Sequence, residues 1–366
     1  MADASSVVVV DYGSDTCKAG FANPEQDPFV VTPTAVRIAS GDSAGAVNGE
    51  EEKFVSPVQR GLVQNWDQLE SILHYLFYDK LGWEFDNEGS VLMCEPLFTP
   101  KEDRERLTQV MFEHFNVNGL YVAEQPVLSM YSVGRVSGTV LDLGHGRCDI
   151  APVLEGVALT PACRRLPFGG LDMTKQLQRL LLDQNTPLSF AEAAAVKEAT
   201  FRVAADSAEF NSILKGETAA EAQTHTLPDG RTITVDTQPF MCGEALFQPS
   251  LVNVDRAGVV EETYHAVMSC LAEQRRPLLE SLLVCGGMGP VPGLDQRFVN
   301  ELADLAPASM RPALVKPPEY MPENTLKYSS WTGGAILAKV VYPQNQHVTK
   351  FDYDEIGPNV IHRKCG

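Results

Sequence analysis

The chain has 366 residues, of which 44% are hydrophobic and 8% aromatic, and it carries a formal net charge of -19. This length is enough for two or three domains with a large buried core, and the hydrophobic content is ordinary for a globular protein. The excess of acidic residues argues against direct binding to a nucleic-acid backbone, because such binding needs a basic surface.

The sequence predicts neither a targeting segment nor a membrane span. Residues 1–6 have neither the basic nor the apolar region of a secretory signal, and no apolar run approaches the ~18 residues that a membrane helix needs. The eight cysteines are scattered, without a C-x-x-C pair or a zinc-like Cys/His spacing. They predict buried free thiols, not a structural metal site. We therefore expect an intracellular protein.

Residues 7–21, VVVVDYGSDTCKAGF, predict a strand, a tight turn and a second strand. Four successive valines suit a strand that is buried on both faces. Gly13 allows close approach to a ligand, and backbone N–H groups in such a turn attract anions. Asp11 is placed to hold a hydrated cation, and Lys18 to reach a phosphate. An ordinary β-hairpin with a polar turn would show the same pattern.

A helix is predicted to start near Thr99. Thr99 would act as the N-cap, Pro100 would take the first helical position, and Glu102 would reach back to the cap. Farther along, His114 falls on the apolar face of the same helix. We therefore expect a packed core histidine and not a metal ligand.

Other elements of the first part of the chain are short. Residues 39–53 are small, polar and acidic, and they predict a mobile loop. Gln125 falls where a strand passes into a helix, a place from which a side chain can face a cleft. Strands are predicted at residues 29–38, 91–94 and 121–123, and a helix at residues 66–77.

The opening pattern recurs at residues 138–156, GTVLDLGHGRCDIAPVLEG. An apolar strand again ends in an aspartate, Asp142, and a turn with Gly144 and Gly146 leads to a second strand. Two such hairpins, about 130 residues apart, indicate an internally duplicated α/β protein. If the halves face each other, Asp11 and Asp142 approach the same cation. Chance recurrence of a short pattern is the alternative.

The second half adds one more glycine-rich turn. A buried strand at residues 282–285 runs into Gly286 and Gly287, whose bare backbone would accept a ribose or a base. Residues 331–340 predict a last helix whose glycines permit close packing. Helices are also predicted at residues 169–182, 189–210 and 261–272, and a tight turn between strands at residues 227–230.

Together these motifs resemble the actin family over essentially the full chain. The resemblance is carried by DYGSDTCKAGF, GLVQNWDQLE, TPKEDRERLTQVMFEHFN, EQPVLSMYSVGRVSG, LDLGHGRCDIAPVLEG, LPDGRTIT, GEALFQPS, VCGGMGPVPG, SSWTGGAILA and YDEIGPNVIHRKCG. ILAKVVYPQNQHVTK and LVKPPEYMPEN are most similar to a plant-type nuclear branch of the family. The resemblance implies an α/β actin fold, with two RNase-H-like halves around a nucleotide cleft.

The family fold implies four subdomains. Subdomain 2, with a shortened loop, is expected at residues 33–56, and subdomain 4 at residues 169–254. The other two are discontinuous in sequence. Subdomain 1 is expected at residues 1–32, 57–132 and 328–366, and subdomain 3 at residues 133–168 and 255–327.

The resemblance also implies a site for ATP or ADP with Mg. Asp11 and Asp142 match carboxylates around the hydrated cation, and Gln125 matches the glutamine that orients the attacking water. Nucleotide contacts are implied for Gly13, Ser14, Lys18, Gly144, His145, Gly146, Lys197, Glu198, Gly286, Gly287 and Lys327.

Several positions depart from the family pattern. Asp15 replaces a glycine and brings a carboxylate near phosphate oxygens, a like-charge arrangement that weakens binding unless a cation offsets it. Asp149 replaces the histidine expected to assist the water, and His145 replaces an aspartate of the second turn. Contacts to ribose and base are changed at Ala194, Pro290 and Val291. We therefore expect altered nucleotide binding and slow or absent hydrolysis.

The resemblance implies a structural subunit of a nuclear, SWI/SNF-type chromatin-remodelling complex. A helix of the remodeller ATPase would cross a groove lined by Tyr131 and Leu337, although helical spacing alone also fits two core residues. A heterodimer with actin or another actin-related protein is a further expectation, as is a nuclear location, with the cytoplasm as a second compartment.

Other functions stay open at this stage. The short acidic loop at residues 39–53 argues against a homopolymer, which needs repeated heterologous contacts. An active actin-like ATPase and a cytoskeletal filament-capping protein are the alternatives, and the fold alone does not decide among them.

Overall fold

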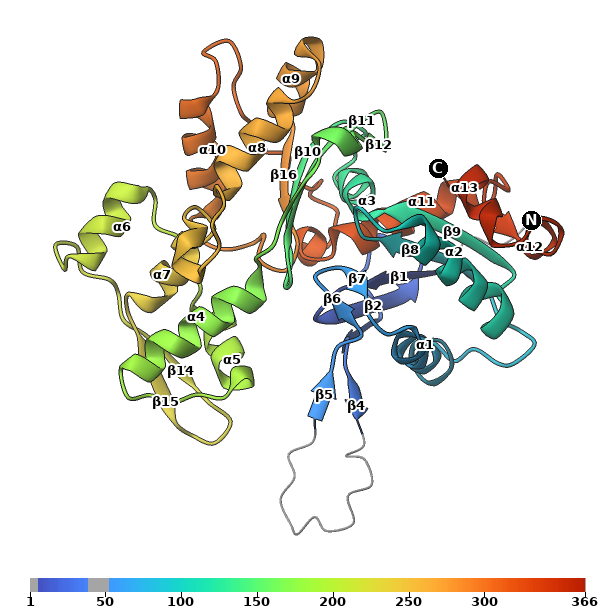
Figure 1. Cartoon of the computed structure of the whole chain (residues 1–366), viewed down its shortest axis with the longest axis horizontal. Coiled ribbons are helices and arrows are strands. Elements are labelled where there is room, and N and C mark those ends of the chain that lie inside the picture. The colour runs from blue at the N-terminus through green and yellow to red at the C-terminus, as the bar shows by residue number, and fades with distance from the viewer. Residues whose placement is uncertain (1–5, 39–52, 366) are drawn as a thin grey trace, which may run out of the picture. The chain divides into compact units, whose positions relative to one another are not determined.

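The computed structural model describes residues 6–38 and 53–365 (Figure 1). The chain divides into two compact units, one made of Met1–Gly134 with Pro318–Gly366 and the other of Arg135–Pro317. The predicted loop at residues 39–53 lies outside the described residues, apart from Lys53. The finer division into four subdomains stays a prediction.

A mixed sheet forms the centre of the first unit. Its strands, as described, are β1 (Val8–Tyr12), β2 (Thr16–Phe21), β3 (Val30–Pro33), β8 (Ser90–Glu95), β9 (Gly119–Glu124) and β17 (Val348–Thr349). They follow the order β17-β9-β8-β1-β2-β3. β1 runs antiparallel to β2 and parallel to β8, and β8 runs parallel to β9. The predicted first hairpin is confirmed.

Helices cover both faces of this sheet. Val8 and Val10 pack in one apolar cluster with α1 (Trp66–His74) and α2 (Lys101–Gln109). Val7 and Val9 point the other way and pack in a second cluster with α3 (Gln125–Ser132) and α11 (Ser329–Val341). The alternation of side chains along a strand explains this division. The prediction that the valine strand is buried on both faces is therefore correct.

Glycine lets α3 and α11 approach each other closely, as Figure 1 shows. A Cβ atom at Gly333 would collide with the carbonyl oxygen of Leu128. Trp331, on the same helix, donates from Nε1 to the carbonyl oxygen of Val9 at 3.1 Å. The predicted role of the α11 glycines in close packing is confirmed.

Short elements complete the first unit. β4 and β5 pair with each other, as do β6 and β7. These elements are β4 (Val36–Ile38), β5 (Lys53–Val55), β6 (Val58–Gln59), β7 (Leu62–Val63), π-helices at Tyr75–Lys80 and Val110–His114, 3-10 turns at Glu323–Leu326 and Pro358–Val360, α12 (Lys350–Ile356) and α13 (Ile361–Lys364).

The second unit repeats the local strand order of the first. Its main strands are β10 (Gly138–Leu143), β11 (Cys148–Leu154), β12 (Val157–Ala158), β13 (Arg164–Leu166) and β16 (Leu282–Cys285). β10 runs antiparallel to β11 and parallel to β16, just as β1 runs beside β2 and β8. Two α/β halves with the same central topology are what the repeated hairpin predicts.

Helices and a second small hairpin surround this sheet. The predicted helix at residues 189–210 is in fact two helices, because Ser189 and Asp206 each cap a separate start. The elements are α4 (Gly170–Asp183), α5 (Phe190–Thr200), α6 (Ser207–Leu214), β14 (Gln223–Thr226), β15 (Thr232–Val235), α7 (Gln238–Glu244), α8 (Val259–Met268), α9 (Ala272–Leu279), α10 (Leu294–Leu305) and 3-10 turns at Thr160–Ala162 and Pro249–Val252.

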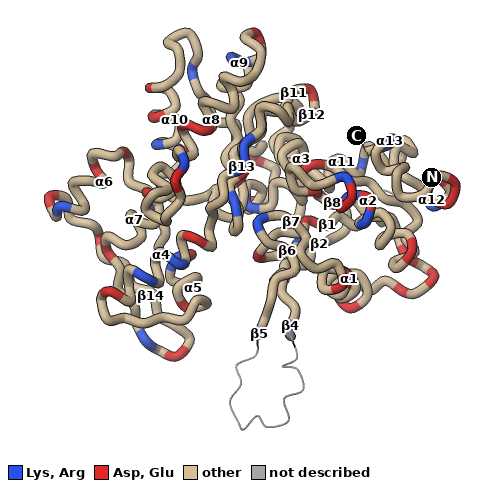
Figure 2. The backbone as a smooth tube through the Cα atoms, viewed as in Figure 1, with Lys and Arg blue, Asp and Glu red and all other residues tan. Residues whose placement is uncertain are grey.

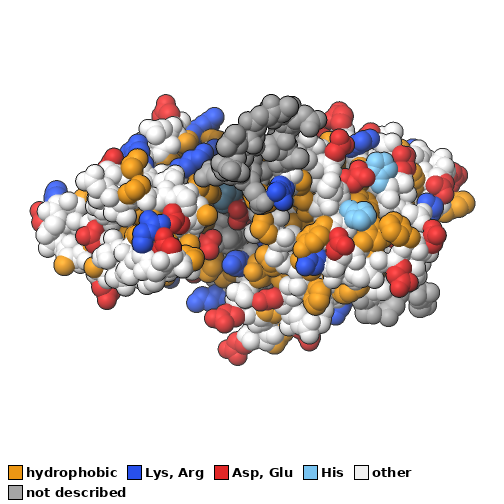
Figure 3. All heavy atoms as spheres, turned by 90° about the horizontal axis from the view of Figure 1, so that it is seen from below, with side chains coloured by type: hydrophobic (Ala, Val, Ile, Leu, Met, Phe, Trp, Pro, Cys, Tyr) orange, Lys and Arg blue, Asp and Glu red, His pale blue; other side chains and the backbone are white. Residues whose placement is uncertain are grey.

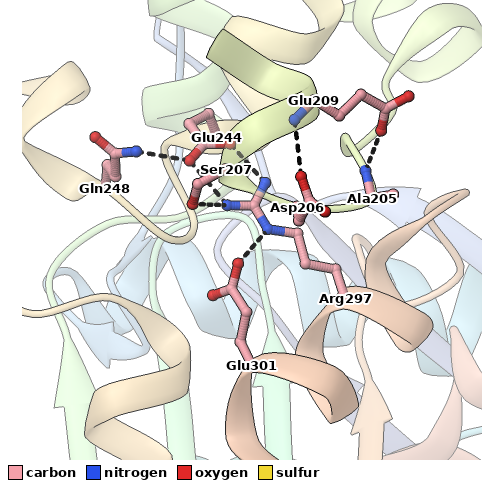
Figure 4. A network of polar contacts seen from close by, with 8 residues as sticks. All are labelled: Ala205, Asp206, Ser207, Glu209, Glu244, Gln248, Arg297 and Glu301. Carbon is pink, nitrogen blue, oxygen red and sulfur yellow. Dashed lines mark hydrogen bonds and ion pairs between the residues drawn. The ribbon is translucent and has the colours of Figure 1, made fainter. Parts of the chain in front are cut away.

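A buried ion pair joins α7 and α10 (Figure 4). The side chains of Glu244 and Arg297 are both fully buried. The Arg297 guanidinium donates to both carboxylate oxygens of Glu244, at 2.5 and 2.8 Å, and its Nε donates to Glu301 at 2.7 Å. Buried charges are tolerated when they are paired and hydrogen-bonded in this way.

All eight cysteines lie among the described residues, and each is a buried free thiol, as predicted. Burial raises the pKa of Cys17 and of Cys242 to about 12. These thiols therefore stay protonated at neutral pH. Among the described residues, none of the helices combines the length and the apolar character needed to cross a bilayer.

Two local predictions around α2 are wrong. Pro100 is the N-cap, and the Thr99 hydroxyl instead donates to the carbonyl oxygen of Pro96 at 2.7 Å. The His114 side chain is 42% exposed, and its Nδ1 lies 2.8 Å from Glu70 Oε1. After α2 the chain continues as a π-helix, whose wider turn breaks the α-helical spacing on which the His114 prediction rested.

Candidate functional site

The turn between β1 and β2 is closed by glycine. Gly13 donates its N–H to the carbonyl oxygen of Thr16 at 3.0 Å, and a Cβ at Gly13 would lie equally close to that oxygen. The Ser14 hydroxyl accepts a hydrogen bond from the N–H of Gly61 at 3.1 Å. The predicted phosphate turn is thus held by its own backbone and by the segment between β6 and β7.

Three predicted functional side chains meet at the end of β1. Asp11 is 7% exposed, and Gln125 donates from Nε2 to its Oδ1 at 2.7 Å. Lys18, directly across the hairpin, places Nζ 3.7 Å from Asp11 Oδ2. An amide and an ammonium group therefore orient and partly neutralise this carboxylate. They remain the groups best suited to meet a phosphate or a hydrated cation in the first unit.

Asp15 is exposed at the tip of the first turn. Its backbone carbonyl accepts a hydrogen bond from the N–H of Thr34 at 2.7 Å. Solvent screens an exposed charge far more than a buried one. We therefore expect the repulsion between Asp15 and a phosphate to be modest.

The turn between β10 and β11 has the same backbone. Gly144 donates its N–H to the carbonyl oxygen of Arg147 at 3.0 Å, and His145 and Gly146 complete the turn. The first N–H groups of α4 hold this turn in place, because Gly170 donates to Gly144 at 3.0 Å and Leu171 donates to His145 at 2.8 Å.

A small residue at the start of α4 is required for this contact. A Cβ at Gly169 would come within 2.6 Å of the carbonyl oxygens of both Gly144 and His145. Lys197, on α5, is nearly buried and donates from Nζ to the carbonyl oxygen of Gly170 at 3.0 Å. The structure thus brings Lys197, one of the implied nucleotide contacts, to the start of the helix that holds the second turn.

An ion cluster lies beside the second turn. Asp149 is buried, and Arg147 donates from Nε to its Oδ2 at 2.6 Å. Arg165 donates to both oxygens of the same carboxylate, at 2.8 and 2.9 Å. Figure 2 shows the basic stretch of β13 (Arg164–Leu166), the strand that contains Arg165. The sequence analysis missed both arginines; Arg165 comes opposite Asp149 only through the pairing of β11 with β13.

Gly286 and Gly287 have different surroundings. Gly286 has φ +88°, and a Cβ there would collide with Asp142 Oδ1 and lie 2.8 Å from the carbonyl oxygen of Leu143. A Cβ at Gly287 would meet no atom of the described chain within 4 Å. Gly286 therefore allows β16 to pass Asp142, whereas Gly287 offers open backbone to a ligand.

The other two predicted contacts are exposed. Glu198 lies on α5 next to Lys197, and Lys327 lies in the first unit with Nζ 5.6 Å from the centre of the Tyr328 ring. Both are available to a ligand or to solvent.

Each unit, taken by itself, offers groups suited to a phosphate. Each has a glycine-closed turn and a lysine, and the second unit adds the open backbone at Gly287. Among the described residues there is no cluster of three or more His, Cys, Asp or Glu side chains that could hold a metal directly. Contact of Asp11 and Asp142 with Mg through water stays a prediction.

Tyr131 and Leu337 lie in the first unit, on α3 and α11. Both are partly buried against the same apolar cluster, which includes Leu128 and Ala338. Burial raises the pKa of Tyr131. Each side chain thus has one part in the core and one part open to solvent, so both are available at the surface.

Comparisons with known proteins agree along the whole length. A family profile described as Actin matches residues 2–191 and 192–366. Proteins called Actin-related protein 7 are 45% identical to this chain, over 360 residues in Oryza sativa subsp. japonica and 364 in Arabidopsis thaliana, covering 98% of this chain and 99% of each relative. Putative actin-29 of Dictyostelium discoideum is 33% identical over 383 residues, covering 99% and 97%.

Proposed function

Because the chain belongs to the actin family, we propose that it is a non-filamentous, nuclear subunit of an ATP-dependent chromatin-remodelling complex of the SWI/SNF type. In this role it binds a helix of the remodeller ATPase and carries ATP or ADP with Mg as a structural ligand. It forms no homopolymer, and it pairs with actin or another actin-related protein. Its location is the nucleus, with the cytoplasm as a second compartment.

The main observation in support of a scaffold role without efficient hydrolysis is the pairing of Asp149 with two arginines. The family resemblance places a water-assisting histidine at this position. Here both carboxylate oxygens accept hydrogen bonds from Arg147 and Arg165. A carboxylate engaged in this way is a poor partner for an attacking water, because proton transfer needs direct hydrogen-bond reach to that water. Hydrolysis is therefore expected to be slow or absent.

The nucleotide itself would be held by groups that the family pattern retains. Lys18 and the first turn, with Ser14, would contact phosphate oxygens, and Lys197 and Gly287 would contact the nucleoside. Lys18 would supply positive charge to the phosphate oxygens. The bound nucleotide would contribute charge and shape that stabilise the folded units.

The partner helix would lie on the surface around Tyr131 and Leu337. An amphipathic helix binds by burying its apolar stripe against apolar side chains of its partner. Partly exposed aromatic and aliphatic side chains, backed by a packed core, are typical of the centre of such an interface. This arrangement supports a binding role for both residues.

Hydrolysis is tested by single-turnover release of phosphate from purified protein with ATP and magnesium. We expect no release above the buffer control, while equilibrium dialysis shows bound nucleotide. The Lys18→Met variant should lose the bound nucleotide, which tests the binding half of the proposal separately. A release rate comparable to that of filament-forming actin would contradict the scaffold role.

The partner is tested by affinity purification from nuclei, followed by identification of the co-purifying subunits. We expect a remodeller ATPase with the native chain and its loss with Leu337→Asp. Leu305→Asp, at an exposed leucine of the second unit, is the matched control and should retain the partner. Sedimentation in polymerising salt should leave the protein in the supernatant.

An active ATPase is the second candidate, and one contact favours it. Gln125 lies 2.7 Å from Asp11, so the water-orienting group implied by the family is present and buried. The phosphate-release experiment decides between the two functions.

A further inference from the structure

A pocket of about 660 Å³ lies in the first unit, and none of the predicted nucleotide or groove residues lines it. The pocket lies where the end of β2 and the segment leading to β3 meet α11 and the end of the first π-helix. Its apolar lining includes Phe21, Phe29, Leu81 and Trp331, and its basic lining consists of Lys80 and Lys339.

Two aromatic rings of the pocket are unusually exposed. Phe21 is 42% and Phe29 is 74% exposed, whereas Trp331 beneath them is 1% exposed. The face shown in Figure 3 also carries hydrophobic side chains among polar and charged ones, and exposed apolar side chains are common on protein surfaces. Two phenylalanines over a hollow with a buried tryptophan form a preformed apolar site of the kind that anchors a partner side chain.

The charge of the pocket is opposite to that of the chain. Lys80 and Lys339 line it, and the carboxylate of Asp27 in the same lining accepts a hydrogen bond from Asn324 at 2.7 Å. The lining thus holds two positive charges and one negative charge, whereas the chain as a whole has a net charge of -19. Local positive charge on an acidic protein attracts acidic segments and repels basic ones.

The pocket is separate from the surface around Tyr131 and Leu337 that is proposed to bind the partner helix. Lys339 follows Leu337 by two residues on α11, which places the two side chains on nearly opposite sides of the helix. The packing agrees, because Leu337 contacts the cluster of α3 whereas Lys339 lines the pocket. One helix thus contributes to two different surfaces.

We infer that this pocket is a second docking site, which takes an acidic segment of a partner protein. An aromatic or aliphatic side chain of that segment inserts between Phe21 and Phe29, and its carboxylates lie against Lys80 and Lys339. This inference goes beyond the proposed function, because it uses neither the nucleotide turns nor the remodeller groove.

The test is fluorescence anisotropy of the whole chain with a short labelled peptide in which several glutamates flank one tryptophan. We expect saturable binding that weakens about tenfold with Lys339→Glu and about tenfold with Phe29→Ser, as for a charged rim and an apolar anchor. Lys101→Glu changes an exposed lysine outside the pocket, and Phe351→Ser changes a phenylalanine that is 75% exposed. Both controls should bind like the native chain, and thermal unfolding should show that all four variants are folded.

Three results would overturn the inference. If the control variants lose as much peptide binding as the pocket variants, the peptide responds to the total charge of the protein or binds exposed apolar side chains non-specifically. Equal binding of a peptide with lysines in place of the glutamates would remove the charge argument. Protein self-association that competes with the peptide and is abolished by Lys339→Glu would identify a second copy of this chain as the occupant.

Discussion

The two hairpin turns have the same backbone hydrogen bond but differ in the charges of the side chains that face each other across the hairpin. In each turn a glycine donates to a carbonyl oxygen three residues on, at 3.0 Å. Across the first hairpin Asp11 faces Lys18, whereas across the second Asp142 faces Asp149. A pair of opposite charges at one site therefore corresponds to a pair of like charges at the other.

The second hairpin avoids the repulsion by using arginines. Arg147 comes from the turn itself and Arg165 from the neighbouring strand β13, and both bind Asp149. The comparison shows that the glycines preserve the shape of the turn while the side chains around it change role. Shape alone therefore predicts that a phosphate can approach, but not that a reaction will follow.

The sharpest difference concerns how each aspartate is supported. Asp11 accepts a hydrogen bond from the side-chain amide of Gln125, whereas the carboxylate of Asp142 lies against the backbone of Gly286. Gly286→Val should destabilise the second unit by more than about 4 kcal/mol, because it combines a left-handed backbone with collisions. Urea unfolding measures the loss. Gly287→Ala is the control and should change stability by less than about 0.5 kcal/mol; similar losses in both variants would refute this account.

The second largest effect is expected on removal of the Asp149 carboxylate, which both arginines bind. Asp149→Asn should cost about 3 kcal/mol, because it leaves two partly buried guanidinium groups without their carboxylate. Lys18→Gln in the first hairpin should cost about 1 kcal/mol or less, since its contact with Asp11 is longer and more exposed. Chemical denaturation of both variants compares the hairpins directly. A larger loss for Lys18→Gln would reverse the comparison.

A smaller, pH-dependent effect is expected beside the first hairpin. Burial raises the pKa of Glu124, the residue before Gln125, and Arg104 only partly offsets this. A raised pKa means that the ionised carboxyl weakens the folded state as the pH rises above the unfolded-state value of about 4.3. Glu124→Gln should therefore raise the unfolding midpoint at pH 7, and the gain should fade near pH 4. Glu198→Gln, at an exposed site, is the matched control for removal of a carboxylate. A loss of stability of the Glu124→Gln variant at pH 7 would contradict the prediction.

The smallest effect on stability is expected at Asp15. Asp15→Gly removes an exposed charge from the first turn, so the free energy of unfolding should change by less than about 0.5 kcal/mol. Nucleotide affinity should rise a few-fold, because one repulsive charge near the phosphates is gone. Isothermal titration with ATP and magnesium measures the change. Unchanged affinity would show that solvent already screens Asp15 fully.

The sequence predicts the backbone of both hairpins well, because valine runs, aspartates and turn glycines are local signals. It predicts that α11 packs closely through its glycines for the same reason. It fails at His114, since the switch from α-helix to π-helix is not visible in the spacing of apolar residues. Local sequence patterns thus predict the strands, turns and helices, but they predict the buried face of a helix less accurately where its geometry changes.

The candidate site is predicted less completely. Asp11, Lys18 and Gln125 are brought together as expected, although Gln125 is more than a hundred residues from the other two. The arginine pair around Asp149 is missed, and for Arg165 the reason is that the sequence does not reveal that β13 lies beside β11. The different roles of Gly286 and Gly287 depend on one backbone angle and one neighbouring side chain, and the dipeptide shows neither.

Because its eight thiols are buried, their reaction with a labelling reagent would report local or global unfolding of the chain. Maleimide and iodoacetamide reagents need an accessible thiolate, so the cysteines of the folded protein should not react with them at neutral pH. Cys17, Cys94 and Cys365 belong to the first unit, and the other five belong to the second. Mass spectrometry of labelled peptides would then time the unfolding of each unit separately. A cysteine substituted for one surface residue would carry a dye without removal of any native cysteine.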